Sequence, residues 1–331
     1  MAKEIGRLNS FALGKETTSG TPVAVTTWVP FESANLKPIT EVIKDESGFG
    51  TISSPADAHV VKQSSEFTAK GIVRPTTFGH ILLATLGQVA APALQETGVY
   101  KHAFTVKNDN NHPAYTIVRD NQTQEEQSSY NMVDSLTLTG EAAQYLRYDV
   151  KIKGRKVTTT TGNTPAYTAT GETPFLVSKA SIKFATNVAG LSGASRTAVQ
   201  NFKLTIDKNL EQIFSTSTDG TEVVDFATQH NKNMAIKGDF EIVYDNETYK
   251  TLALAGTLQA VEIMLEGRTL IGATKYENIT IQLASVVLED WGKSDDNDEI
   301  VTQSFGFTAL YKLAETKQIT IDLTNARNTA Y

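Results

Sequence analysis

Apolar and polar residues alternate along many short stretches of this chain, and no other feature of the sequence restricts the fold as strongly. Successive side chains of a β-strand point to opposite faces, so this alternation is typical of antiparallel strands that bury one face. The clearest examples are residues 135–139, 145–153, 202–206, 278–283 and 318–323. The sequence therefore predicts a mainly β protein.

Two segments show instead the spacing of an amphipathic helix. Residues 76–86 follow Pro75, and residues 247–258 follow Asp245 and Asn246, which are residue types common at helix starts. The apolar residues that share one helical face are Phe78, Ile81, Leu82 and Leu86 in the first segment and Tyr249, Leu252 and Ala253 in the second. We expect one flanking α-helix in each half of the chain.

The two halves also share short patterns at a nearly constant distance. An Asn-Leu-x-x-Ile pattern begins at Asn35 and again at Asn209, 174 residues later. Glu66 precedes a phenylalanine, as Asp239 does 173 residues later. The strands expected after each helix are 100–107 and 114–119 in the first half and 261–266 and 279–283 in the second. A tandem duplication explains this common order, and chance similarity between two all-β halves is the alternative.

The predicted organisation is therefore two tandem domains joined by a linker. Residues 158–174 are rich in Thr, Gly and Pro, a composition typical of a connecting segment without a core of its own. The predicted domains are then 1–157 and 175–331. Residues 325–331 are expected to be a mobile tail or an arm that becomes ordered on a neighbouring chain.

Charge and composition argue against several classes of function. The net charge is −7, and no run rich in Lys or Arg stands out, whereas tight DNA binders usually carry a basic patch. The longest apolar run, at 81–86, is far too short to cross a membrane, and the N-terminal residues lack the apolar region of a secretory signal. We expect neither sequence-specific nucleic-acid binding nor membrane insertion.

No catalytic or metal-binding pattern stands out. Cysteine is absent, which excludes disulfides and thiolate chemistry. The acidic stretch at 295–299 lacks the glycine of a calcium loop, and Gly48-Phe49-Gly50 lacks the third glycine of a dinucleotide loop. None of the histidines has a partner at zinc-binding spacing; they are His59, His80, His102, His112 and His230. We therefore expect no enzyme activity, no cofactor and no metal.

Several segments resemble a known family. Gly14, Glu16, Gly20 and Thr21 form a Gly-x-Glu-x-x-x-Gly-Thr pattern, which the apolar stretch 28–31 and a Ser-x-x-Leu-x-Pro stretch at 33–38 follow. Together with residues 133–139 and 199–210, this order is similar to that of the major tail tube proteins of long-tailed, siphovirus-type bacteriophages. The second half departs from the pattern, because it has no equally clear Gly-Thr-Pro segment.

The resemblance implies a fold, an assembly and a place in the virion. Each half would be a tail-tube-type β-sandwich or barrel domain, and hairpins from several domains would join into a continuous barrel around a lumen. Three chains with pseudo-sixfold symmetry are favoured over six chains for each ring. The implied partners are copies of the chain itself and the tape measure, tail terminator and tail-tip proteins. DNA would only pass through the lumen, and the protein would be made in the host cytoplasm and reside in the virion tail.

Two long segments between strands would stack one ring on the next. They are residues 40–64 and 215–234, and both are unusually long for loops without a partner. The candidate stacking residues are Thr40, Asp45, Gly48, Gly50, Asp57, Asp219, Gly220 and Asp225. Ordinary surface loops are the alternative.

Other functions remain open from the sequence. The chain could be another tube or a tail-completion component of a phage or of a contractile injection system. A carbohydrate-binding β-sandwich is a third alternative, although such sites usually cluster exposed aromatic residues, and Trp28 and Trp291 are far apart in the sequence.

Overall fold

A computed structural model describes residues 5–53, 57–167, 172–216, 223–294 and 300–331. The chain is mainly β, as predicted, with two α-helices in the part described: α1 (Phe78–Leu86) and α2 (Thr248–Ala255). Short 3₁₀ turns occur at Gly6–Leu8, Val177–Lys179 and Ala189–Ser192. Strands are present at all the predicted positions, but those at Glu125–Glu141 and Tyr276–Lys293 are much longer than the expected 135–139 and 278–283. The first helix begins two residues later than expected.

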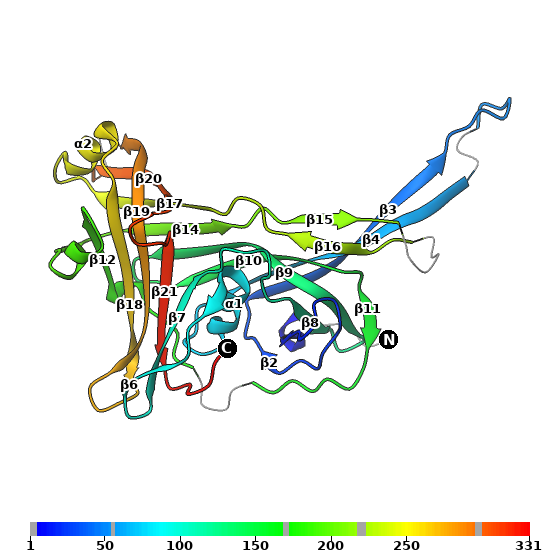
Figure 1. Cartoon of the computed structure of the whole chain (residues 1–331), viewed down its shortest axis with the longest axis horizontal. Coiled ribbons are helices and arrows are strands. Elements are labelled where there is room, and N and C mark those ends of the chain that lie inside the picture. Colours follow the sequence, from blue (N-terminus) through cyan, green and yellow to red (C-terminus); the bar gives the residue numbers. More distant parts are fainter. Residues whose placement is uncertain (1–4, 54–56, 168–171, 217–222, 295–299) are drawn as a thin grey trace.

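An eight-stranded antiparallel sheet, called here the main sheet, extends through both halves of the chain (Figure 1). In spatial order its strands are β3 (Ser33–Asp45), β4 (Asp57–Ile72), β10 (Arg147–Gly154), β9 (Glu125–Glu141), β14 (Asn201–Asp207), β17 (Ala235–Val243), β20 (Thr302–Ala309) and β19 (Tyr276–Lys293). The first four strands come from the first half and the last four from the second. The pairing of β9 with β14 joins the two halves.

Two smaller sets of strands continue from the long strands β9 and β19. The N-terminal part of β9 pairs with β8 (Tyr115–Asp120) and β11 (Thr158–Thr160), and β8 continues to β1 (Ser10–Lys15) and β2 (Thr27–Trp28). The N-terminal part of β19 pairs with β18 (Gln259–Leu270) and β21 (Ile319–Asn325). β18 continues to β12 (Ala180–Ala185) and β13 (Arg196–Thr197), and β21 to β7 (Val99–Val106), β5 (Gly87–Val89) and β6 (Ala93–Glu96). β9 and β19 are therefore the corner strands where one sheet passes into the next.

The two halves follow the same pairing order. It is β2–β1–β8–β9–β10–β4–β3 in the first half and β13–β12–β18–β19–β20–β17–β14 in the second. This order corrects two correspondences expected from sequence. In the structure, β8 corresponds to β18 and β9 corresponds to β19. The sequence patterns had instead suggested that β7 corresponds to β18 and β8 to β19. Asn35 lies inside β3, but Asn209 lies just after β14 ends, so the two Asn-Leu patterns are not equivalent positions.

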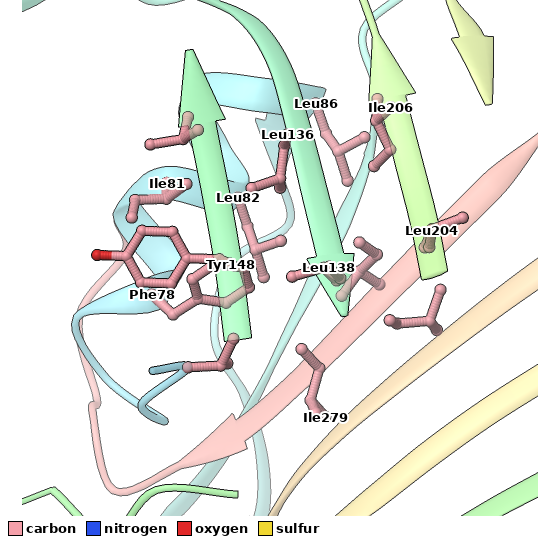
Figure 2. Close-up of a cluster of buried hydrophobic side chains, with 14 of the residues drawn as sticks. Phe78, Ile81, Leu82, Leu86, Leu136, Leu138, Tyr148, Leu204, Ile206 and Ile279 are labelled. Carbon is pink, nitrogen blue, oxygen red and sulfur yellow. The ribbon is translucent and has the colours of Figure 1, made fainter. Parts of the chain in front are cut away.

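Helix α1 fills the core beneath the main sheet. Figure 2 shows Phe78, Ile81 and Leu82 pointing toward the apolar face of strands β9, β10 and β14. The N-terminal turn is closed by the Glu172 carboxylate, which accepts hydrogen bonds from the Thr76 and Thr77 amides at 3.0 Å each. Helix α2 is peripheral, because none of its residues is fully buried.

The C-terminal residues do not form the free tail or arm expected from sequence. Tyr331 is buried, and its ring packs against His80, His102 and Phe104. Its hydroxyl accepts a hydrogen bond from the Asn325 side chain at 2.7 Å. The polar composition of this segment resembled that of a tail, but the absence of a side chain at Gly79 leaves room for the Tyr331 ring.

Part of the range predicted as a linker, 158–174, is bound to the first half of the chain by backbone pairing and hydrogen bonds. β11 adds to the edge of β9, and the Glu125 carboxylate accepts hydrogen bonds from the Gly162 amide and from the backbone and side chain of Asn163.

Candidate functional site

One face of the main sheet is polar along its whole width. Because strands alternate, Phe67, Val150, Leu138 and Phe202 point into the core, and their sequence neighbours point to the other face. We call this other face the polar face. Its residues include Asn35, Lys37, Glu66, Thr68, Lys70, Ser135, Thr137, Thr139, Arg147, Asp149, Lys151, Lys153, Lys203, Thr205, Asp207, Lys237, Asp239, Glu241, Glu289, Ser304 and Thr308.

The polar face carries charges of both signs, and several neighbours pair across strands. Lys70 and Asp149 form an ion pair at 2.7 Å, which raises the pKa of the Lys70 ammonium. The Thr137 and Thr205 hydroxyls lie 3.1 Å apart across the joint between the halves. Cations are thus interspersed with anions and hydroxyls, an arrangement that favours hydration over strong attraction for a polyanion.

The main sheet ends in two open edges. β3 pairs only with β4, and no strand of the described chain pairs with its other side. From Val287 onward, β20 is the one described strand with which β19 pairs. Open edges present unpaired backbone donors and acceptors, so they can join another chain.

A long hairpin, formed by β3 and β4 and called here the projecting hairpin, extends beyond the rest of the chain at the end opposite α2 (Figure 1). It exposes more apolar surface than a solvated hairpin needs. Its exposed apolar residues are Ile39, Val42, Ile43, Phe49, Ile52 and Val60. The sequence predicted a loop at 40–64, but both ends of this range are strand. The strands were missed because both of their faces are exposed, and such strands need not alternate apolar and polar residues.

A short hairpin formed by β15 (Glu211–Phe214) and β16 (Phe226–His230) lies against the projecting hairpin. The Gln63 amide donates to the Val224 carbonyl at 3.1 Å, and the Val224 amide donates to the Val61 carbonyl at 2.9 Å. Of the loop predicted at 215–234, residues 226–230 are therefore a strand, which pairs with β15 just before the loop. Val224 in the same range contacts the projecting hairpin.

The candidate stacking residues lie on these two hairpins where they are described. Thr40 and Asp45 lie on β3 and Asp57 begins β4, while Gly48 and Gly50 lie in the turn, where Gly50 adopts a left-handed φ of 73°. Asp225 precedes β16, and partial burial raises the pKa of its carboxyl. Asp219 and Gly220 lie outside the described residues.

Sequence reasoning missed Arg155, which connects three parts of the site. Its guanidinium lies 5.2 Å from the centre of the Tyr130 ring and 5.8 Å from that of Phe226, and it donates to the Gly20 and Ala227 carbonyls. No local pattern marks this residue, because its partners come from distant segments.

Glu16, from the N-terminal Gly-x-Glu-x-x-x-Gly-Thr pattern, contacts two of the residues that Arg155 also contacts, Gly20 and Tyr130. Glu16 is buried, and its carboxylate accepts hydrogen bonds from the Gly20 amide at 2.6 Å and from the Tyr130 amide at 2.8 Å. Gly20 has a left-handed φ of 88°, and a side chain there would collide with Arg155. The spacing of Glu16 and Gly20 thus allows the hydrogen bond that closes this turn, and Arg155 donates to the Gly20 carbonyl in it.

The structure also has a cavity of about 790 Å³, and Trp28, Phe31, Arg74, Tyr167 and Glu172 are among its lining residues. Two of its polar residues, Arg74 and Glu172, have partners within the fold. Arg74 donates to the Glu172 carbonyl at 2.6 Å, while the Glu172 carboxylate closes helix α1.

Across the described residues, no cluster of His, Asp and Glu has the arrangement of a metal site. In the same part of the chain, no helix has the length and apolar character needed to cross a membrane.

A protein-family model described as phage tail tube protein matches residues 6–309. The match includes both halves of the chain and every strand of the main sheet. No curated protein matches the chain closely enough to indicate kinship.

Proposed function

The chain belongs to the phage tail tube protein family, and on that premise we propose that copies of it close into rings that stack into the hollow tube of a siphovirus-type tail. Its role is structural, in the tail of the virion. In the proposed assembly, phage DNA passes through the lumen during ejection.

The observation that carries this proposal is the main sheet, which has one buried face, one polar face and two open edges. It contains an even number of antiparallel strands, so β19 of one chain meets β3 of the next in the same antiparallel sense as every other pair. Such a head-to-tail contact generates a ring when the rotation closes, and closure removes both edges. The polar face then lines the lumen.

The common pairing order of the halves supports a ring of three chains. Each half supplies four strands to the main sheet, so three chains present six similar units around the axis. We propose that the halves are tandem domains, 1–157 and 175–331, related by duplication. Pseudo-sixfold symmetry follows from three chains, whereas six chains would double the number of strands around the lumen.

The polar face suits the passage of DNA. Ion pairs such as Lys70–Asp149 neutralise part of its positive charge, and Thr and Ser hydroxyls keep the wall hydrated. A wall of dense lysine and arginine would instead bind phosphates and slow the DNA.

Ring stacking is assigned to the projecting hairpin together with β15 and β16. Its exposed apolar side chains would be buried against the next ring, which explains their presence on a hairpin that packs on little of its own chain. We further propose that the ends of the tube contact the tail terminator and tail-tip proteins and that its lumen holds the tape measure protein before ejection.

Negative-stain microscopy of the purified protein tests the proposal. We expect rings or tubes that become more abundant with protein concentration, and a high copy number of this chain in purified particles. A protein that stays monomeric at high concentration, even when seeded with tail-tip proteins, would contradict the assembly. A low copy number would instead indicate a tail-completion component.

A further inference from the structure

We infer that the joint between neighbouring chains copies the joint between the two halves of one chain, with Lys293 of one chain opposite Thr40 of the next. This inference rests on the proposed ring and specifies its interface. The partner is a second copy of this chain. The template is the pairing of β9 with β14, because β9 is the counterpart of β19 and β14 is the counterpart of β3 in the common pairing order.

The strand pairs within each half align β3 with β14. Phe67 on β4 and Phe240 on β17 each follow an acidic residue and point into the core. Leu36 is opposite Phe67, and Phe202 is opposite Phe240. Leu36 therefore corresponds to Phe202, and counting four residues further along both strands, Thr40 corresponds to Ile206.

A shared β-bulge aligns β19 with β9. On β9 the register shifts between Val133, opposite Ile152, and Ser135, opposite Lys151. On β19 it shifts between Glu289, opposite Gly306, and Gly292, opposite Ser304.

The strands opposite these bulges match as well. Ile152 is opposite Phe67, and Phe305 is opposite Phe240, so the two bulges stand at the same place in each half. The residue that follows the bulge is Ser135 on β9 and Gly292 on β19. One residue further, Leu136 corresponds to Lys293. Within the chain Leu136 is opposite Ile206, so the copied joint sets Lys293 opposite Thr40.

The directions of the backbone groups agree with this register. The Gln63 amide points away from β3, toward Val224, so Thr40, which is opposite Gln63, directs its own backbone groups to the open edge. The Ser294 amide donates to Thr302 on β20, so by alternation Lys293 directs its backbone groups outward. In this register the outward-pointing backbone groups of β3 meet those of β19, whereas a slip of one residue would set them opposite residues whose backbone groups point toward β20.

Disulfide trapping tests the register directly, because the chain has no cysteine of its own. Ile39 and Ser294 flank the central pair and are predicted to face each other without mutual backbone hydrogen bonds, a pair type with Cα atoms about 4.5 Å apart. The variant carries Ile39→Cys and Ser294→Cys. The corresponding pair within the chain, Thr137→Cys and Thr205→Cys, is the positive control, and it should close inside one chain.

The expected result is a reducible ladder of cross-linked chains on a non-reducing gel when microscopy shows rings or tubes. Two shifted pairs, Lys37→Cys or Glu41→Cys with Ser294→Cys, should give at least about fivefold less cross-linking, because a slip of two residues separates the sulfurs. Stronger cross-linking by a shifted pair, or none by any pair in assembled tubes, would overturn the register and leave the proposed function standing. If the wild-type protein forms no rings, the proposed function and the proposed register are both contradicted.

Discussion

Individual residues hold the two halves together at points that are distant in sequence. Lys208, at the end of β14 in the second half, is fully buried, and its ammonium donates to the Ala84 carbonyl in the last turn of α1 at 3.2 Å. Carbonyls at a helix C-terminus attract a cation, which compensates in part for its loss of water. Tyr331, from the second half, also contacts α1 of the first half: its ring fills the space beside the helix that Gly79 leaves open.

Lys208 makes stability depend on pH in the alkaline range. Burial lowers the pKa of its ammonium to about 7, against the opposing effect of Asp134. Between pH 7 and the ordinary lysine pKa of 10.5, the unfolded chain binds a proton that the folded chain does not, so stability rises with pH. We expect Lys208→Met to lose this rise, which urea unfolding at pH 7 and pH 9.5 would measure.

Lys203→Met is the matched control, because Lys203 lies on the same strand but is exposed on the polar face. It should keep the wild-type dependence on pH. An equal response of the two variants would contradict the role given to Lys208.

Tyr331 should contribute strongly to the stability of the single chain. Tyr331→Ala removes a buried ring and is expected to cost about 3 kcal/mol of unfolding free energy. Tyr331→Phe loses only the hydrogen bond from Asn325 and should cost about 1 kcal/mol. Chemical denaturation of both variants checks the order. If Tyr331→Ala is as stable as wild type, the segment is a free arm after all.

At the level of elements, the two hairpins and the two helices have unequal roles. Helix α1 lies inside the core, whereas α2 packs from outside through Tyr249, whose ring stacks on Phe305 at 4.8 Å. The projecting hairpin contributes little to the core, and in the proposed assembly its long exposed strands contact other chains. The segment before β16 is hydrogen-bonded to it through Val224, and Arg155 contacts β16 through the Phe226 ring.

Removing apolar groups from the hairpin tip should impair assembly without affecting the fold. Phe49 is 64% exposed, and Phe49→Ser together with Ile52→Ser should change the unfolding free energy by less than about 0.5 kcal/mol. We expect shorter tubes or free rings in electron micrographs. Leu313→Ser, at a residue 83% exposed in another part of the chain, is the control and should assemble normally. Tubes of normal length from the hairpin variant would contradict the stacking role.

At the level of the whole molecule, the sequence predicts the architecture better than the assembly site. Alternation locates β9, β10, β14 and β19 in the main sheet, because each must bury one face, and helical spacing locates α1 and α2. It fails for the projecting hairpin, which has no buried face near its tip. It also fails for Tyr331, whose burial depends on a gap beside Gly79 far away in the chain.

The site depends on which strands are neighbours, and local patterns do not carry that information. The position of Thr40 on an open edge follows from the pairing of β3 with β4 alone. Arg155 is a charged residue like many others until the fold brings Tyr130 and Phe226 around it. The polar face becomes continuous only when eight strands from both halves are placed side by side.

Electron cryomicroscopy of assembled tubes tests the central claim most directly, because it shows which surface of the main sheet faces the lumen. We predict a continuous barrel with eight strands from each of three chains, the polar face inside and β19 paired with β3 of the next chain. A tube whose lumen is lined by another surface, or in which β3 and β19 remain unpaired, would contradict the account.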